Sequence, residues 1–385
     1  MPSHTAAASP FYREEHQVFR EQVRRFTERE ILPHIDAWED AGTIPRELHG
    51  RAAEAGILQI GYPEEYGGIE IPDHFYSIVR TLELARAGSG GLMAGLLTHG
   101  IACPPIVAVG TAEQKEKFLR PVLTGSKIAA LAITEPGAGS DVASIKTTAA
   151  RDGSDYIVNG QKTFITSGLR ADYVTCAVRT GGEGMGGISL LLIETDRPGF
   201  SRTPLRKMGW HCSDTAALYF DRLRVPAGNL LGAENDGFKR IMLNFNGERL
   251  GIIAHGIGLA EVCYEDGLAY ARERVTFGRP LIKNQVIRHK LVEMRMRLDA
   301  LRAQLDLLTW RVSQKQTLAA EIGLLKVNTA TALEWIVGEA MQIFGGAGYL
   351  RGNRVERIYR DTKIVSIGGG SLEVMKDLAA RQLGY

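Results

Sequence analysis

The sequence predicts a mainly α-helical protein with an inserted β domain, and three observations support this fold class. Apolar residues recur with the helical 3.6-residue period from Phe11 to about residue 120. From Lys127 the pattern becomes that of strands, and it ends near Pro226. After Gly237 the helical period returns over three long segments, 238–274, 285–314 and 318–344. We therefore expect an N-terminal α-helical domain (1–126), a middle β-sandwich or barrel (127–235) and a C-terminal four-helix bundle (236–385).

Composition and charge exclude several classes of protein. The 385 residues are 44% hydrophobic and 23% charged, as in ordinary globular proteins that bury a large core. A net charge of +2 argues against nucleic acid as a partner. The four cysteines are scattered and form no CxxC pair, so neither disulfides nor a metal site is expected. No leader pattern and no apolar run of membrane-spanning length are found, which predicts a cytoplasmic enzyme without a membrane span.

Turn and cap signals divide the N-terminal region into helices. Prolines 33 and 45 precede a helix predicted over 46–55, and a second helix over 74–87 is followed by a small-residue segment (88–95). An apolar helix is then expected to end near Val109. Thr111 and Gln114 have the spacing of a capping box for a helix over 113–119.

Two dipeptides in the middle region are hairpin signals. Asn159-Gly160 lies between β-like runs at 156–158 and 163–166, and Asp152-Gly153 is the second such pair. Between 131 and 147 a strand breaks at a Pro- and Gly-containing turn, which lets backbone N–H groups approach a ligand. This turn matches neither the GxGxxG nor the P-loop pattern, and its residues alone are equally compatible with an ordinary loop.

Five spaced motifs resemble those of the acyl-CoA dehydrogenase family. They are AITEPGAGSD (132–141), NGQK (159–162), RVTFG (274–278), QIFGG (342–346) and YRDTKI (359–364). Their order, and a similarity that runs from about Phe11 to Ala380, argue against a chance match. The resemblance implies FAD as cofactor, an acyl-CoA substrate and α,β-dehydrogenation, with electron-transfer flavoprotein as acceptor. It also implies a homotetramer built as a dimer of dimers, and a bacterial protein of this type is expected.

The resemblance implies which residues bind the flavin. Thr134 and the backbone at Ile133 would donate hydrogen bonds to the ring, whose reduced form gains electron density. The turn at Gly139 and Ser140 would lie near the pyrophosphate, and Ser140 also near the pantetheine arm of the substrate. The stretch that would lie along the flavin is Phe164, Ile165 and Thr166, with Phe164 where the family more often has Trp. Core packing of Phe164 and Ile165 remains an equally good interpretation.

A second set of residues would bind the FAD of a neighbouring subunit. Arg274 is suited to this because its planar guanidinium pairs with phosphate oxygens bidentately, although an Arg at a helix end is equally compatible with the helix dipole. If the set acts on the partner's cofactor, FAD binding requires at least a dimer. The set is Arg274, Thr276, Phe277, Gln285, Gln342, Gly345 and Gly346.

The catalytic base departs from the usual family pattern. Most members carry a Glu shortly after the RDAKI-like motif, and Gly369 stands there in this chain. Long-chain and isovaleryl members instead place the Glu on a bundle helix before an Arg, which matches Glu248. Glu248 lies in line with apolar residues and has no Lys or Arg three or four residues away, so burial should raise its pKa. The residues in line with it are Ile241, Phe245, Ile252, Leu259 and Val262.

Other residues near the base acquire expected roles from the same resemblance. Gly369 would keep the backbone N–H that binds the thioester carbonyl while lacking the carboxylate. Ser371 and Glu373 would contact FAD, although Glu373 fits an exposed helix start equally well. Asn246 would lie at the substrate, and Arg249 would reach the substrate or a bundle carboxylate.

The substrate class and the alternative functions are inferred from less specific sequence patterns. Small residues from Gly88 to Ala102 suggest room for a medium, long or branched acyl chain, although they also permit close helix packing. His211 and Cys212 are too few for a metal site, and His255 is interpreted as a satisfied core histidine. The alternatives are an acyl-CoA oxidase or flavin hydroxylase of the same fold, and a non-catalytic protein that binds flavin or CoA.

Overall fold

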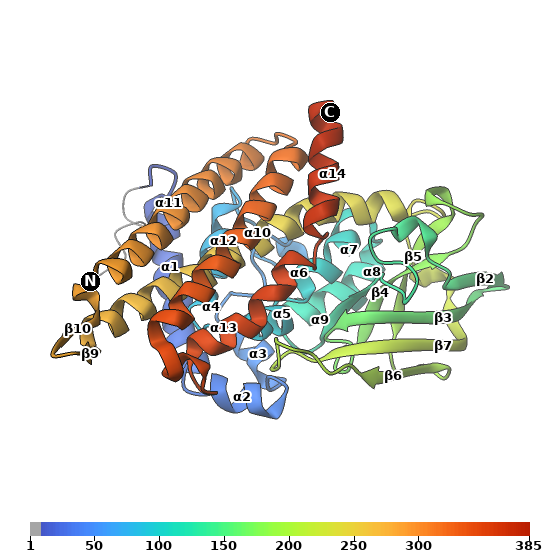
Figure 1. Cartoon of the computed structure of the whole chain (residues 1–385). Coiled ribbons are helices and arrows are strands. Elements are labelled where there is room, and N and C mark those ends of the chain that lie inside the picture. The colour runs from blue at the N-terminus through green and yellow to red at the C-terminus, as the bar shows by residue number, and fades with distance from the viewer. Residues whose placement is uncertain (1–8) are drawn as a thin grey trace.

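The N-terminal region is built from short helices. The computed structural model describes residues 9–385, apart from the side chains of 243–246. Figure 1 shows the long helices on the left of the molecule and the strands of the large sheet gathered on the right. The helices are α1 (Glu14–Phe26), α2 (Ile35–Ala41), α3 (Glu47–Glu54), α4 (Phe75–Ala85), α5 (Gly90–Leu96), α6 (His99–Ala102), α7 (Pro104–Val109), α8 (Ala112–Gln114) and α9 (Arg120–Leu123).

Local signals explain most of these helix boundaries. The capping box is confirmed, because the Gln114 backbone N–H donates to Thr111 Oγ1 at 3.2 Å and the Thr111 N–H donates to Gln114 Oε1 at 3.0 Å. The single apolar helix expected to end at Val109 is wrong, because the chain breaks between α6 and α7 at Cys103-Pro104. Proline has no N–H to donate, so the helical hydrogen bonds are interrupted at Pro104, although Cys103 itself keeps helical angles (φ −90°, ψ −25°).

The middle region forms a mixed eight-stranded sheet in two groups of strands. A single bridge between Thr148 and Arg179 joins β2 to β4, so one group is β6-β7-β3-β2 and the other is β1 and β8 beside β4-β5. Both groups contribute to one apolar core, for example Val158 and Leu218 from one and Val174 and Leu191 from the other. The strands are β1 (Ala129–Ala132), β2 (Thr148–Asp152), β3 (Asp155–Thr166), β4 (Tyr173–Arg179), β5 (Ile188–Glu194), β6 (Phe200–Pro204), β7 (Thr215–Pro226) and β8 (Leu230–Leu231).

The two hairpin signals have different outcomes. Asp152-Gly153 is confirmed, since β2 and β3 pair antiparallel with Asp152 opposite Asp155. Asn159-Gly160 is wrong as a hairpin, because it lies inside β3 at a bulge where the pairing with β7 shifts register. Gly160 has φ +144°, and a Cβ there would lie 2.7 Å from Thr147 Cα. The glycine therefore serves a bulge and a close backbone contact.

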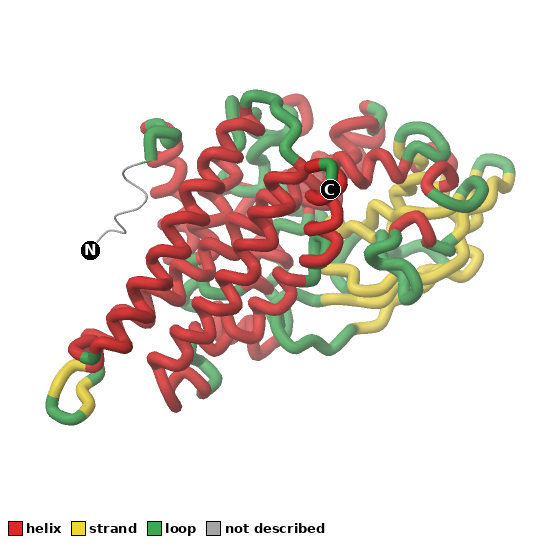
Figure 2. Tube along the Cα trace, turned by 45° about the horizontal axis from the view of Figure 1, so that its top comes forward, coloured by secondary structure: helices red, strands yellow, loops and turns green. Residues whose placement is uncertain are grey.

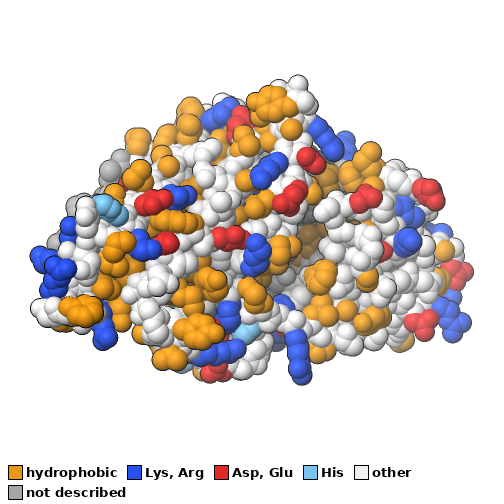
Figure 3. Space-filling model, in the orientation of Figure 1, with side chains coloured by type: hydrophobic (Ala, Val, Ile, Leu, Met, Phe, Trp, Pro, Cys, Tyr) orange, Lys and Arg blue, Asp and Glu red, His pale blue; other side chains and the backbone are white. Residues whose placement is uncertain are grey.

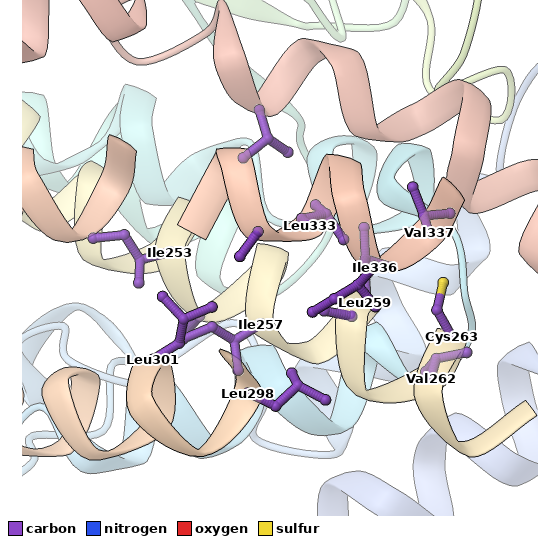
Figure 4. Close-up of a cluster of buried hydrophobic side chains, with 14 of the residues drawn as sticks. Ile253, Ile257, Leu259, Val262, Cys263, Leu298, Leu301, Leu333, Ile336 and Val337 are labelled. Atoms are coloured by element: carbon purple, nitrogen blue, oxygen red, sulfur yellow. The ribbon is translucent and has the colours of Figure 1, made fainter. Parts of the chain in front are cut away.

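The C-terminal region is a bundle of long helices. They are α10 (Gly237–Glu273), α11 (Gln285–Ser313), α12 (Ala319–Phe344), α13 (Arg354–Thr362) and α14 (Leu372–Leu383). A short hairpin, β9 (Val275–Thr276) and β10 (Arg279–Pro280), joins α10 to α11. Figure 4 shows Ile257 of α10, Leu301 of α11 and Leu333 of α12 meeting in the bundle core. The three long helices predicted from periodicity are confirmed.

The length and apolarity of a helix decide whether it could span a membrane. Of the helices in the described residues, none alone is long and apolar enough to cross a membrane. The segments 90–96 and 99–109 meet the criterion only as a pair bent by 53°.

Candidate active site

Glu248 lies on α10 with its carboxylate hidden from solvent and little to pair with. Its Oε2 atom is buried and accepts no hydrogen bond from any described residue. Burial raises the pKa of Glu248 to about 7, against the smaller opposing effects of the positive charges on Arg249 and Lys326. Such a carboxyl group exchanges a proton near neutral pH, as the sequence predicted for a general base.

The Gly368–Gly370 loop brings Gly369 to Glu248. This loop leads into α14, and Gly369 and Gly370 have φ values of +65° and +99°, which L-residues with side chains rarely adopt. A Cβ at Gly369 would lie 2.5 Å from Ile252 Cδ1 and 3.8 Å from Glu248 Oε1. The Gly369 N–H has no hydrogen-bond partner in the part of the chain that the structure describes. A free backbone donor therefore lies beside a carboxylate supplied by another helix.

Arg249, next to Glu248, contacts the Gly368–Gly370 loop. It is 8% exposed, and its Nε–H donates to the carbonyl oxygen of Gly369 at 3.4 Å. Burial lowers the pKa of Arg249 and the negative charge of Glu248 opposes this effect; that Arg249 reaches the substrate or a bundle carboxylate stays a prediction. Asn246, the other residue expected at the substrate, and Phe245 of the apolar stripe have side chains outside the described residues.

The two polar residues at the start of α14 behave as helix-start residues. Ser371 is the N-cap, and its Oγ accepts a hydrogen bond from the Val374 N–H at 3.4 Å. Glu373 is exposed in the first turn, where hydrogen bonds with its own backbone and with Ser371 lower its pKa. No contact in the structure distinguishes an FAD role for these residues from capping.

A buried ion pair holds the turn at 131–147. Lys162 is fully buried on β3, and its Nζ donates to the Ile133 carbonyl at 2.9 Å and to Glu135 Oε1 at 2.8 Å. Glu135 also accepts from the backbone N–H groups of Lys146 at 2.6 Å and Thr147 at 2.9 Å. The sequence patterns did not single out Lys162 for this role. Glu135 is thereby engaged on all sides and fixes the turn.

The neighbouring β3 stretch presents a flat apolar surface. The Thr163 N–H donates to the Thr134 carbonyl at 2.8 Å, which ties β3 to the end of β1. Phe164 is 69% exposed with φ +60°, whereas Ile165 is 2% exposed and belongs to the core. Phe164 is therefore exposed and available to a cofactor, whereas Ile165 packs in the core of the β domain. An exposed aromatic ring held in an unusual backbone conformation fits a planar aromatic cofactor such as a flavin.

The remaining residues expected at the same cofactor surround this surface. Thr134 and Thr166 are half-buried, and Gly139 and Ser140 are exposed on the turn. Neither the Thr134 nor the Ser140 hydroxyl makes a hydrogen bond with another described residue. These hydroxyls are therefore available to a ligand, and the residues present fit FAD.

Comparison with known families decides what this arrangement belongs to. Three family models match in order: "Acyl-CoA dehydrogenase, N-terminal domain" at residues 13–126, "middle domain" at 130–223 and "C-terminal domain" at 235–384. The chain belongs to the acyl-CoA dehydrogenase family. It is an FAD-dependent oxidoreductase that acts on acyl-CoA thioesters, as the motifs predicted.

Individual relatives match this acyl-CoA dehydrogenase over nearly its whole length. Acyl-CoA dehydrogenase AFT10-1 of Alternaria alternata is 39% identical over 96% of this chain and 92% of its own. The long-chain specific mitochondrial enzyme of Rattus norvegicus is 37% identical over 96% of this chain and 86% of its own. The crystal structure of a probable acyl CoA dehydrogenase from Mycobacterium abscessus is 48% identical, with a TM-score of 0.95, and covers 97% of this chain and 100% of its own.

The second set of predicted FAD residues lies far from Glu248 in this acyl-CoA dehydrogenase. Arg274 follows the last residue of the 37-residue helix α10, about 39 Å along the helix from Glu248 at 1.5 Å per residue. Figure 2 shows the β9–β10 hairpin projecting from the end of the bundle opposite the sheet. Stacking of Tyr270 on Phe344, with ring centroids 4.4 Å apart, brings the end of α12 to the same place.

This remote set is exposed to solvent. Phe277 at the hairpin has an exposed fraction of 105% and φ +50°, and the Arg274 side chain makes no bond or ion pair with any described residue. Figure 3 shows hydrophobic and Lys or Arg side chains side by side at this end of the molecule. The chain therefore does not bring its two groups of FAD residues together within itself. Gln285, Gln342, Gly345 and Gly346 are likewise exposed.

Two of the small residues expected to leave room for the acyl chain, Gly88 and Gly90, serve close packing, whereas nothing lies within 4 Å of a Cβ built on Gly100. A Cβ at Gly90 would lie 2.1 Å from Trp210 Nε1, and one at Gly88 would lie 2.3 Å from Arg354 Cγ. Buried Asp361 holds this contact, since its carboxylate accepts the Gly90 N–H at 2.9 Å and the Trp210 N–H at 2.6 Å. The packing alternative is therefore the better account of Gly88 and Gly90.

Two histidines were interpreted as chemically uninvolved. His255 is buried, and burial lowers its pKa to about 4, so it is neutral. It is not satisfied as expected, because its Nε2 has no partner in residues 9–385. His211 packs with Arg360, and Cys212 Sγ lies 3.3 Å from Ser89 Oγ. The described part of the chain holds no group of three or more potential metal ligands.

Proposed function

We propose that Glu248 is the catalytic base with which this acyl-CoA dehydrogenase introduces a trans α,β double bond into its substrate. One observation carries the proposal: Glu248 Oε1 lies 3.8 Å from the Cβ position of Gly369. The α10 carboxylate thus occupies the space that a side chain at 369 would face. A Glu at 369 itself is excluded by the contact with Ile252 Cδ1 at 2.5 Å, unless Ile252 moves.

The residues around the base suit both requirements of α-proton removal, which are a group that accepts the proton and a donor that stabilises the charge on the thioester carbonyl. The hidden Oε2 of Glu248 is free to accept the proton, and the pKa near 7 leaves the group able to take it up at neutral pH. The unpaired Gly369 N–H would donate to the thioester carbonyl as negative charge develops there. Arg249 holds the carbonyl of the same residue and so keeps the peptide oriented.

FAD, when bound, would supply the oxidant that takes up the β-hydrogen of the substrate. On the protein side, the Thr134 hydroxyl and the Phe164 ring would position the isoalloxazine, and Ser140 would lie near the substrate arm. Glu135 takes no part in proton transfer because Lys162 and two backbone N–H groups already engage it.

The assembly and the electron acceptor form the second part of the proposal. The distance of about 39 Å between Glu248 and Arg274 supports an FAD site completed by a neighbouring subunit. A dimer is then the smallest competent unit, and a dimer of dimers is expected. Electron-transfer flavoprotein is the proposed acceptor, medium, long or branched acyl-CoAs are the proposed substrates, and the cytoplasm is the proposed location.

The decisive experiment is anaerobic bleaching of the flavin by straight and branched acyl-CoAs of graded length. Glu248→Gln should keep FAD but lose acyl-CoA-dependent bleaching by several orders of magnitude, because the amide cannot accept the proton. Glu265→Gln, on the same helix but paired with Arg86 near the surface, is the matched control and should bleach normally.

Each other outcome points to a different function. Near-normal bleaching in Glu248→Gln would refute the assignment of the base. Absence of bleaching in the unmodified protein with every acyl-CoA would favour the non-catalytic alternative. Rapid reoxidation by air after bleaching would favour an oxidase.

A further inference from the structure

Lys326 is a buried cation in the middle of α12 to which neither the motifs nor the mechanism above assign a role. Its exposed fraction is 0%. Its Nζ donates hydrogen bonds to two carbonyl oxygens, that of Gly368 at 2.8 Å and that of Gly370. These carbonyls belong to the residues on either side of Gly369. The ammonium group therefore clamps the loop that carries the unpaired Gly369 N–H.

The packing of α12 against α14 explains how the ammonium reaches the loop. One turn before Lys326, a Cβ at Gly323 would already lie 3.4 Å from the Met375 carbonyl oxygen. α12 and α14 therefore pack against each other at Gly323, and Lys326, one turn further along α12, reaches the carbonyls of Gly368 and Gly370 just before α14 begins. A buried ammonium group is costly unless acceptors replace its water, and the two carbonyls do so.

The same ammonium group acts electrostatically on the base. The charged groups that influence Lys326 are Glu248 and Arg249 on α10 and Glu373 on α14. Those that influence Glu248 are Arg249 and Lys326, and both lower its pKa against the effect of burial. A positive charge near a buried carboxyl group favours its ionised form, which is the form that accepts a proton.

We propose that Lys326 is a positioning residue for dehydrogenation: it fixes the Gly368–Gly370 loop so that the Gly369 N–H faces the thioester carbonyl, and its positive charge favours the ionised form of Glu248. The proposal rests on the function proposed for Glu248 and Gly369. Lys326 touches neither substrate nor cofactor and exchanges no proton with them. It acts through the orientation of one peptide and through the charge on one carboxyl group.

The two contributions are separable with three variants. Lys326→Met removes both the donors and the charge, Lys326→Gln keeps amide donors but no charge, and Lys326→Arg keeps the charge but displaces the donors. Lys363→Met is the matched control, because it removes a nearby but exposed Lys whose partner is Glu334. FAD content and the thermal unfolding midpoint of each purified variant show whether it has folded.

The probe is an acyl-CoA with sulfur in place of the β-carbon. Such a thioester can lose its α-proton to the base but has no β-hydrogen to give, so the bound anion accumulates and is detected by its long-wavelength absorbance with the flavin. A pH titration of this absorbance reports on the base without turnover. Flavin reduction by an ordinary acyl-CoA is measured in parallel.

We expect the titration midpoint to rise by about one pH unit in Lys326→Met and Lys326→Gln, because the carboxyl group loses a neighbouring positive charge. In Lys326→Arg and Lys363→Met the midpoint should stay in place. The rate of flavin reduction should fall at least tenfold in Lys326→Met and also in Lys326→Arg, since both lose the hydrogen bonds to the Gly368 and Gly370 carbonyls. If Lys326→Met does not retain FAD, the Gln and Arg variants carry the test.

Failure of this proposal is distinguishable from failure of the proposed base. An unchanged midpoint and rate in the Lys326 variants, with proton loss abolished in Glu248→Gln, would overturn the role of Lys326 alone. Proton loss that persists in Glu248→Gln would instead overturn the assignment of the base.

Discussion

At the scale of single residues, this protein carries out its chemistry with groups whose burial costs stability. Glu248 was predicted as the base because long-chain and isovaleryl members of the family place their Glu before an Arg on a bundle helix, and because it lies on an apolar stripe with no Lys or Arg three or four residues away. Lys326 gave no such signal. Its partners are backbone carbonyls more than 40 positions away, and no pattern of side chains encodes them.

The raised pKa of Glu248 makes a prediction about stability. Its folded pKa of about 7 exceeds the unfolded value near 4.5, so the folded protein binds this proton more tightly. That stability is fully present below pH 4.5 and is lost as the pH rises through 7. Glu248→Gln has no charge to bury, and its unfolding free energy should exceed that of the unmodified protein by ~3 kcal/mol at pH 8.

The measurement is urea unfolding of both proteins at pH 5 and pH 8 with saturating FAD. The difference between them should be small at pH 5 and large at pH 8. Equal stability at pH 8, or a less stable Gln variant, would mean that Glu248 is not a buried, unpaired carboxyl group.

At the scale of elements, the long helices follow from periodicity, whereas the strand turns depend on contacts made far along the chain. Asn159-Gly160 has the composition of a tight turn, yet Asn159 Oδ1 accepts the backbone N–H of Arg222 on β7 at 2.8 Å, and Gly160 lets Thr147 pack against β3. The positions of both residues depend on contacts with Arg222 and Thr147, which are distant in sequence and which the local pattern does not reveal. Nothing lies within 4 Å of a Cβ built on Gly153, and Asp152-Gly153 forms the predicted turn, with the Asp152 carboxylate paired with Arg224 of β7 at 2.7 Å.

This contrast predicts different effects at two glycines with left-handed φ values. Gly160→Ala places a Cβ 2.7 Å from Thr147 Cα and should push the 131–147 turn away from β3. We expect a loss of about 2 to 4 kcal/mol in stability and weaker FAD binding. Gly153→Ala, with φ +59° and nothing within 4 Å of its Cβ, is the control and should lose only about 1 kcal/mol, with FAD binding unchanged.

Both effects are measured by urea unfolding and by fluorescence titration of the apoprotein with FAD. If Gly160→Ala binds FAD as tightly as the control, the close contact between Thr147 and β3 does not hold the flavin surface in place.

At the scale of the whole molecule, the sequence predicts the three regions. It does not tell whether one chain alone holds every residue of the active site. The RVTFG motif follows the end of α10, about 39 Å along that helix from Glu248, at the end of the bundle opposite the β-sheet beside which the 132–141 motif lies. Linear order alone cannot tell whether such motifs meet within a chain or between chains. The length of α10 supports the proposal that they meet between chains, since no rotation of side chains closes a gap of about 39 Å.

Arg274→Glu should therefore weaken FAD binding at least tenfold without unfolding the monomer, because an exposed side chain with no described partner is replaced by one that repels phosphate. FAD retained after gel filtration is the readout, and Arg272→Glu on the last turn of α10 is the control. Undiminished FAD in Arg274→Glu would show that the hairpin does not reach a cofactor.

The length of α10 also has a genetic consequence. If each catalytic centre combines the base of one chain with the hairpin of its partner, a dimer of one Glu248→Gln chain and one Arg274→Glu chain concentrates both defects in one centre and leaves the other intact. Two inactive alleles expressed together would then complement each other and restore up to half the activity per mixed dimer.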